Sequence, residues 1–246
     1  MKKVVMKFGG TSVATGENIR RVASIVAENV KKGYSVVVVV SALAGVTNQL
    51  LEEAEQAKKQ SERKVQEFTR QLAERHLEAA EKAIEDEGIQ KEVRQVIKKT
   101  VDELEKVLMG ICYVGEVTPK SKDYVLSFGE RLSAPLVWGA LRNIKVPTQY
   151  FTGKEAGIVT DDNFGEARPL MNVTTHHVRE RLEPLLEKKI VPVVTGYIAA
   201  TQDGIVTTLG RGGSDYTATI LSVALSADEV WIWTDVDGIM TTDPKI

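Results

Sequence analysis

A lysine and two glycines near the start of the chain form a pattern that suits phosphate binding. Lys-Phe-Gly-Gly-Thr-Ser occupies residues 7–12 and follows a short apolar run. Gly9 and Gly10 would let the backbone approach a ligand closely, and successive N–H groups can form an anion-binding nest. The Lys7 ammonium would add a point positive charge. The spacing matches neither the P-loop nor the dinucleotide-binding glycine motif, so this segment alone indicates either an anion site or an ordinary turn.

A second glycine-rich segment surrounds an arginine. Gly-Arg-Gly-Gly-Ser-Asp at residues 210–215 directly precedes a predicted helix at 216–225. A free backbone, a helix N-terminus and the planar cation of Arg211 together suit recognition of a carboxylate or a phosphate. Three glycines cost conformational entropy, so a purely structural loop would seldom need all of them. This segment is the most specific local signal in the chain.

Three further segments carry polar groups. Ser41, followed by Val-Thr-Asn at residues 46–48, comes directly after five valines, and it either caps the next helix or contacts a ligand. Ser-Phe-Gly-Glu-Arg at residues 127–131 places Glu130 at an expected helix start. There it would either complement the helix dipole or bind a substrate ammonium group. Residues 234–244 form a polar loop after the last predicted strand.

These segments combine cations and backbone amides with no evident catalytic base such as a triad histidine. Phosphorylation of a carboxylate would explain that combination. An aspartate side chain has an ordinary pKa of about 3.9, so the nucleophile is already ionised at neutral pH. The protein would then need only to position two anions and neutralise their charge. A kinase that phosphorylates a hydroxyl would more often show an added base.

The elements that must position these segments alternate between strand and helix. A strand that is apolar at every position, such as residues 36–40, suits a parallel sheet buried on both faces. The four main segments are predicted at carboxyl ends of strands, where open α/β sheets bind their ligands. We therefore expect one α/β domain with a mostly parallel sheet and helices on both faces. The predicted strands are residues 3–7, 36–40, 190–195 and 230–234, with a hairpin arm at 205–209, and the predicted helices are 18–31 and 216–225.

Residues 52–110 differ from the rest of the chain in their density of charged side chains. Apolar residues recur there at helical spacing on either side of Gly88, which predicts two amphipathic helices joined by a turn. Such a pair is either a partner-binding surface or a solvated layer packed on one edge of the domain, and we favour the second. His76 falls within this pattern without a second metal ligand nearby and is predicted to be structural.

The composition excludes several classes of function. The 246 residues carry a formal net charge of −2, which gives no general attraction to nucleic acid or to an anionic membrane. No segment approaches the roughly 20 apolar residues that span a bilayer. Cys112 is the only cysteine, so an internal disulfide is impossible. These features predict a cytoplasmic protein without nucleic-acid or membrane partners.

Taken together and in order, the motifs resemble the signature of aspartate kinases, which belong to the amino acid kinase superfamily. The resemblance extends over residues 1–246, including the helical insertion at about 52–113. It implies an α/β/α sandwich built on a mainly parallel open sheet with an inserted helical pair. It also implies ATP and Mg²⁺, phosphorylation of L-aspartate to 4-phospho-L-aspartate, an early step of lysine, threonine and methionine biosynthesis, and a homodimer. The motifs are residues 7–12, the valine strand with Ser41 and residues 46–48, residues 127–131, residues 210–215, and Thr-Asp-Val-Asp-Gly at 234–238.

The resemblance also assigns roles to single residues. Lys7 would stabilise the transferring phosphoryl group, and Asp215 would orient that lysine through an ion pair. Glu130 would bind the ammonium group of aspartate, and Arg211 would bind a carboxylate. Further substrate contacts would come from Ser41, Thr47 and Ser214, and contacts to the nucleotide from Gly9, Gly10, Gly213, Thr234, Asp235 and Lys245.

The chain departs from the family pattern in two ways. Met240 and Lys245 stand where the family usually has a tyrosine and an arginine, and lysine lacks the bidentate fork of arginine. Family members also continue past the Asp-Pro segment into a Phe-Gly-Ala-Lys motif and paired regulatory domains. We therefore expect a catalytic domain truncated at its C-terminal end, with weak or absent kinase activity and no feedback inhibition.

Two alternatives remain open. One is another kinase of the same superfamily, acting on acetylglutamate, glutamate, carbamate or uridylate. The motifs around Glu130 and Arg211 and the helical insertion argue against it. The other is a non-catalytic module that keeps the fold for ligand binding or dimerisation. Intact Lys7 and Asp215 argue against that alternative.

Overall fold

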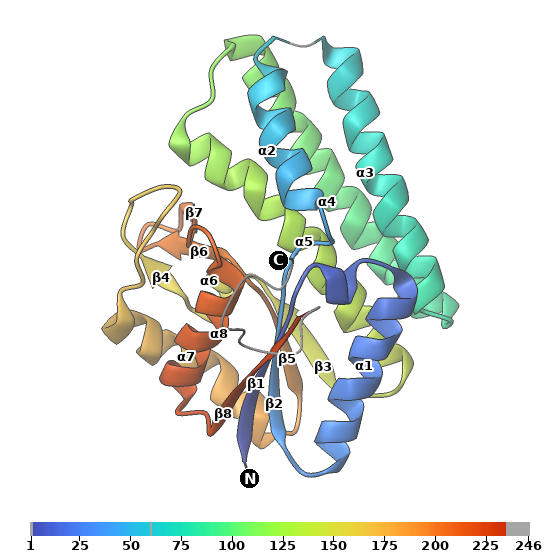
Figure 1. The fold of residues 1–246 in the computed structure, drawn as a ribbon, viewed down its shortest axis with the longest axis vertical. Coiled ribbons are helices and arrows are strands. Elements are labelled where there is room, and N and C mark those ends of the chain that lie inside the picture. The colour runs from blue at the N-terminus through green and yellow to red at the C-terminus, as the bar shows by residue number, and fades with distance from the viewer. Residues whose placement is uncertain (1, 60, 235–246) are drawn as a thin grey trace, which may run out of the picture.

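A parallel sheet forms the centre of the protein. The computed structural model describes residues 2–59 and 61–234. Within these residues the main sheet has five parallel strands in the order β3-β5-β2-β1-β8 (Figure 1). These strands are β1 (Lys3–Phe8), β2 (Ser35–Val40), β3 (Thr148–Phe151), β5 (Val191–Thr195) and β8 (Glu229–Trp233).

The valine strand β2 explains why helices cover both faces of this sheet. Val36, Val38 and Val40 pack into one apolar core, whereas Val37 and Val39 pack into the other. Successive side chains of a strand point to opposite faces, so a strand that is apolar throughout needs cover on both. The mostly parallel α/β architecture predicted from the sequence is confirmed. Helices α1 (Gly16–Lys31) and α5 (Pro119–Asn143) line the first core, and α7 (Met171–Glu187) and α8 (Gly213–Leu225) line the second.

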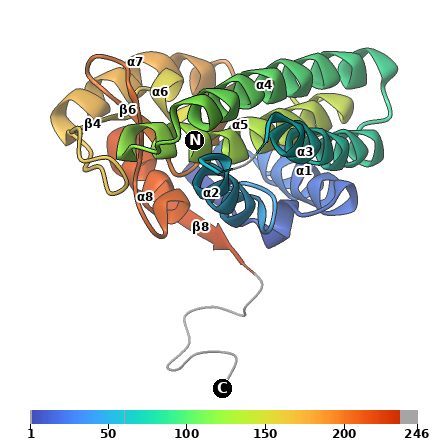
Figure 2. The ribbon, with the colours of Figure 1, turned by 90° about the horizontal axis from the view of Figure 1, so that it is seen from above.

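A smaller sheet lies at one end of the molecule. It contains β4 (Val159–Thr160), β6 (Ile198–Thr201) and β7 (Val206–Thr208). Strands β6 and β7 pair antiparallel across the Asp203-Gly204 turn, which confirms the predicted hairpin arm. Seen from above, β4, β6 and α7 lie at the opposite end of the molecule from α1 and α3 (Figure 2). Two short helical segments, η1 (Thr11–Val13) and α6 (Gly153–Ala156), lie in loops after β1 and β3.

The charged helical region contains α2 (Val46–Ala57), α3 (Glu62–Ala83) and α4 (Glu87–Val114) (Figure 1). The predicted pair corresponds to α3 and α4, but its turn falls at residues 84–86, and Gly88 lies in the first turn of α4. Asp86 determines this boundary, because its side chain accepts a hydrogen bond of 3.0 Å from the backbone N–H of Ile89 and caps the helix. Helix α2, not separately predicted, occupies the start of the region.

The predicted helix start at residues 127–131 is wrong. These residues lie in the middle of α5, which begins at Pro119 with Thr118 as its N-cap. Because α5 is buried on nearly every side along this stretch, its sequence shows no clear apolar stripe. The other three predicted site segments do follow strands, namely β1, β2 and β7. Across the described residues, no helix is both long and apolar enough to span a membrane.

Candidate active site

The loops that follow four adjacent strands meet at the carboxyl edge of the main sheet. The N–H of Gly9, after β1, donates to the carbonyl of Trp233 at the end of β8 over 3.2 Å. The N–H of Ser41, after β2, donates to the carbonyl of Phe8 over 3.1 Å. The N–H of Gly196, after β5, donates to the carbonyl of Val40 over 2.8 Å. This is the edge where an open α/β sheet binds its ligands.

An ion pair stands at this edge. The Lys7 Nζ lies 2.7 Å from Oδ1 of Asp215, and Lys7 is only 9% exposed. Asp215 lies in the first turn of α8, where its carboxylate also complements the helix dipole. A Cβ added to Gly9 would lie 3.5 Å from the Lys7 Nζ, so the ammonium is seated beside the glycine turn. The contact implied by the resemblance is therefore present, whereas the catalytic roles of both residues stay predictions.

The glycines of residues 210–213 each meet a steric requirement. Gly210 and Gly212 have φ angles of +75° and +74°, a left-handed conformation that side chains rarely adopt. A Cβ on Gly213 would lie 2.6 Å from Cδ2 of Tyr197. The absence of side chains at these positions lets the loop pack closely against Tyr197 and turn directly into α8.

Glu130 is the most unusual ionisable group of the site. It is 3% exposed, and its Oε1 accepts a hydrogen bond of 3.1 Å from the backbone N–H of Ala42. Its Oε2 is buried without a hydrogen-bond partner among the described residues. Burial raises the pKa of this carboxyl to about 8. A buried polar atom left unpaired costs about 1–3 kcal/mol, so this oxygen is suited to receive a donor from a ligand.

The other predicted residues surround this edge at different depths. Arg211 is exposed, and it forms no hydrogen bond or ion pair with any residue in the described ranges. Ser214 is partly buried, and its Oγ lies 2.5 Å from where a Cβ on Gly196 would be. Ser41 and Thr47 are partly buried at the ends of the loop that leads to α2, and Thr234 is exposed after β8. Asp235, Met240 and Lys245 lie outside the described residues.

Two residues near the candidate site have unusual environments that sequence reasoning missed. Tyr197 follows β5 with a φ of +65°, which is strained for a bulky side chain. Burial raises the pKa of its phenol, and the negative charges of Glu130 and Asp123 add to that effect. Asp123 is 1% exposed and accepts hydrogen bonds from the N–H and the hydroxyl of Thr208 and from the N–H of Gly165. Asp123 lies seven residues before Glu130 on α5, so the two side chains are on the same face of the helix. This relation could be predicted only once residues 119–143 were known to be helical.

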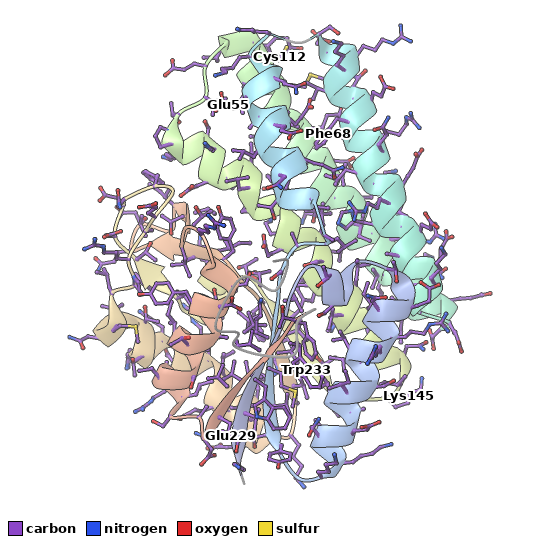
Figure 3. The ribbon with its side chains drawn as sticks, viewed as in Figure 1. Glu55, Phe68, Cys112, Lys145, Glu229 and Trp233 are labelled. Carbon is purple, nitrogen blue, oxygen red and sulfur yellow. The ribbon has the colours of Figure 1, made fainter. Side chains whose placement is uncertain are left out.

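The single cysteine lies far from this site. Cys112 is in α4, in the helical region, whereas Trp233 marks the carboxyl end of β8 near the centre of the molecule (Figure 3). His76 is fully buried in α3, where its Nδ1 lies 2.7 Å from the carbonyl of Leu72, and burial lowers its pKa to about 4. Neither residue is placed to act as a nucleophile or base at the sheet edge, and His76 has the predicted structural environment.

This fold and site define an α/β protein with a mostly parallel sheet, whose carboxyl edge carries two glycine-rich loops and the ion pair between Lys7 and Asp215. Residues 2–246 match the model of the amino acid kinase family, and the chain belongs to that family. It is 36% identical to the chloroplastic aspartokinase 1 of Arabidopsis thaliana, over 98% of this chain and 42% of that protein. It is also 36% identical to the aspartokinase of Mycolicibacterium smegmatis, over 100% of this chain and 44% of that protein.

Solved structures give the same picture. Aspartokinase III of E. coli in complex with aspartate and ADP superposes with a TM-score of 0.88 at 33% identity, over 99% of this chain and 52% of that chain. The same enzyme in complex with lysine and aspartate gives a TM-score of 0.87, over 100% of this chain and 52% of that chain. This chain spans about half the length of the relatives that it matches.

Proposed function

We propose that this chain carries the phosphoryl-transfer centre of an aspartokinase, which converts ATP and L-aspartate into ADP and 4-phospho-L-aspartate. The observation that carries this proposal is the ion pair between Lys7 and Asp215 beside the glycine turn. The unpaired buried oxygen of Glu130 supports it from the substrate side. The likeness to an aspartokinase solved with aspartate and ADP gives further support.

The proposed chemistry needs no proton transfer. A side-chain carboxylate oxygen of aspartate forms a bond to the γ-phosphorus of ATP, the bond from that phosphorus to the bridging oxygen breaks, and ADP leaves with the electron pair. The nucleophile is ionised at neutral pH, so a general base is unnecessary. The Lys7 ammonium would neutralise charge on the transferring group, and Asp215 would hold that ammonium in place.

Glu130 and Arg211 would fix the orientation of aspartate. The buried carboxylate of Glu130 would pair with the substrate ammonium, which supplies the donor that Oε2 lacks. The exposed guanidinium of Arg211, on a glycine loop, can form a bidentate pair with a carboxylate. Two opposite charges at fixed positions would distinguish an α-amino acid from a plain dicarboxylate. Ser41, Thr47 and Ser214 would contribute hydroxyl groups.

The nucleotide would lie against the loops after β1 and β8. Gly9, Gly10 and Gly213 would face its phosphates, and Thr234, Asp235 and Lys245 would contact the rest of the nucleotide. Within the described ranges, no group of three or more His, Cys, Asp or Glu side chains could hold a metal. In this proposal Mg²⁺ would be held mainly by the nucleotide phosphates and water. In this proposal the enzyme works in the cytoplasm as a homodimer and serves lysine, threonine and methionine biosynthesis.

The test is ADP release measured with a panel of acceptors: L-aspartate, L-glutamate, N-acetyl-L-glutamate, carbamate and UMP. Enzyme is used in excess over ATP so that a slow single turnover is detected. The proposal expects ADP release that depends on L-aspartate alone. Turnover with another acceptor and not with aspartate would favour a different kinase of the family. Calorimetric binding of both aspartate and ATP without any turnover would favour a non-catalytic binding module.

A further inference from the structure

An arginine of the charged helical region reaches the candidate active site. Arg75, on α3, donates a hydrogen bond of 2.7 Å from Nη2 to the backbone carbonyl of Ala44. The N–H of Ala44 in turn donates to the carbonyl of Gly10 over 3.2 Å. One residue of the loop after β2 therefore connects α3 to the glycine turn beside Lys7.

That loop, residues 41–45, supplies the backbone on which the proposed aspartate site rests. Ala42 binds the buried carboxylate of Glu130 through its N–H. A Cβ added to Gly10 would lie 2.9 Å from the carbonyl oxygen of Ala42, so the loop and the glycine turn are in close contact. Gly45, with a φ of +82°, then turns the chain into α2, whose first turn carries Thr47. A displacement of Ala44 would therefore also displace Gly10, the backbone N–H that binds Glu130, and Thr47.

Helix α3, which carries Arg75, packs closely against the start of α1. Gly16, the first residue of α1, faces α3 so closely that a Cβ there would lie 2.4 Å from Cβ of Lys82 and 2.7 Å from the carbonyl oxygen of Ala79. The N-terminal end of α1 therefore meets the C-terminal end of α3, and in Figure 1 α1 lies below α3. Since α1 follows the glycine turn in the chain, α3 and the turn are parts of one packed unit.

The charge of Arg75 is directed at the loop and not at an acid. It is partly buried and has no ion-pair partner among the residues that the structure describes. Arg70, five residues earlier on α3, differs in this respect, because it forms an exposed ion pair of 2.8 Å with Glu74. A hydrogen bond from a charged donor to a carbonyl is stronger than a neutral one.

We propose that Arg75 is a positioning residue, which fixes the loop of residues 41–45 against the glycine turn and so sets the geometry of the aspartate site. This inference rests on the proposed function only for its kinetic consequence. Its structural consequence, an ordered loop, can be measured without any substrate. The helical region would then contribute to the active site and would not merely cover one edge of the sheet.

The test compares Arg75→Met, Arg75→Lys and the control Arg70→Met in the full chain. Methionine keeps most of the apolar stem of Arg75 and removes the hydrogen-bond donor. Lysine keeps the positive charge, but its side chain is shorter and lacks the guanidinium group. Hydrogen–deuterium exchange of the peptide covering residues 41–50 is followed by mass spectrometry. Loss of the hydrogen bond is expected to speed exchange in this peptide by about tenfold in Arg75→Met. Arg75→Lys is expected to fall between wild type and Arg75→Met, and exchange in Arg70→Met should match wild type.

Aspartate and ATP kinetics supply the second readout. Arg75→Met should lower kcat/KM for aspartate by about 10- to 100-fold, with a much smaller change in KM for ATP. If exchange is faster in Arg75→Met than in wild type but the wild-type chain phosphorylates no aspartate, the positioning role stands and the proposed function fails. Exchange at residues 41–50 that is equal in Arg75→Met, Arg70→Met and wild type would overturn the positioning role.

Discussion

Glu130 and Ala42 lie 88 residues apart in the chain, and the carboxylate of one accepts a hydrogen bond of 3.1 Å from the backbone N–H of the other. This contact ties the middle of α5 to the loop after β2. It satisfies one oxygen of a buried carboxylate and leaves the second unpaired among the described residues. The predictions below on aspartate affinity and on the pH dependence of stability follow from that asymmetry.

Aspartate affinity should depend on pH through Glu130. Its pKa in the free protein is about 8, so the carboxyl is mostly protonated at pH 6, whereas pairing with an ammonium group requires the ionised form. Binding should therefore release a proton, and the Kd for aspartate should rise by up to about tenfold for each pH unit below 8. Calorimetry at pH 6 to 8, in two buffers of different ionisation enthalpy, measures both effects. An affinity that is flat over this range would contradict the proposed role.

Glu130 should also make the protein less stable as the pH rises. Its pKa in the folded state, about 8, lies above the ordinary value of 4.5. Between these values the unfolded chain has lost the proton and the folded chain still holds it. The free energy of unfolding should therefore fall by up to about 1.4 kcal/mol per pH unit through this window. Urea unfolding at pH 5, 6, 7 and 8 measures the slope, which Glu130→Gln should reduce.

Loss of Lys7 should impair phosphoryl transfer far more than aspartate binding. Lys7→Met removes the cation proposed to stabilise the transferring group, so kcat should fall by about 100-fold or more. Asp215→Asn leaves the lysine present but without its charged partner and should have a smaller effect. Because the Asp215 side chain is 52% exposed, losing this pair should change stability by less than about 1 kcal/mol. An unchanged kcat in Lys7→Met would rule out the assigned role.

Gly129 should be intolerant of even a methyl group. A Cβ there would lie 2.8 Å from Cβ of Ala42, so Gly129→Ala must displace α5 or the loop after β2. Overpacking of this kind costs about 1–3 kcal/mol. Gly110→Ala in α4 is the matched control, because a Cβ there meets no atom of its surroundings within 4 Å. That variant should gain up to about 1 kcal/mol from helix propensity. Thermal unfolding of both variants gives the comparison, and equal stabilities would contradict the packing argument.

The parts of the fold that follow local patterns were predictable from the sequence. The all-valine strand, the Asp-Gly hairpin turn and the helix predicted at 216–225 each carry their own signal, although that helix, α8, already begins at Gly213. The position of residues 127–131 inside α5 was not predictable, because a helix buried around its whole circumference loses the apolar stripe that marks most helices. Tyr197 adopts its left-handed backbone through tertiary contacts, with Gly213 and Thr217 among its neighbours, and no sequence feature announces this.

The contacts of the site divide in the same way. The two glycine-rich segments could be singled out from local sequence, although the Gly9-Gly10 pair alone is equally consistent with an ordinary turn. The pairing of Lys7 with Asp215 came only from the family resemblance, because no local pattern relates two residues that lie on different elements far apart in the chain. The hydrogen bond from Arg75 to the carbonyl of Ala44 could not be predicted from the sequence. An arginine on a charged amphipathic helix looks the same whether it faces solvent or a loop.

The most direct measurement is the capture of the acyl phosphate itself. The chain is incubated in excess with γ-labelled ATP, Mg²⁺ and L-aspartate, and hydroxylamine is added to convert any 4-phospho-L-aspartate into the stable hydroxamate. The account predicts aspartyl hydroxamate and labelled inorganic phosphate in equal amounts, with both products greatly reduced in Lys7→Met. Hydroxamate formed equally by Lys7→Met, or formed only when another acceptor replaces aspartate, would contradict it.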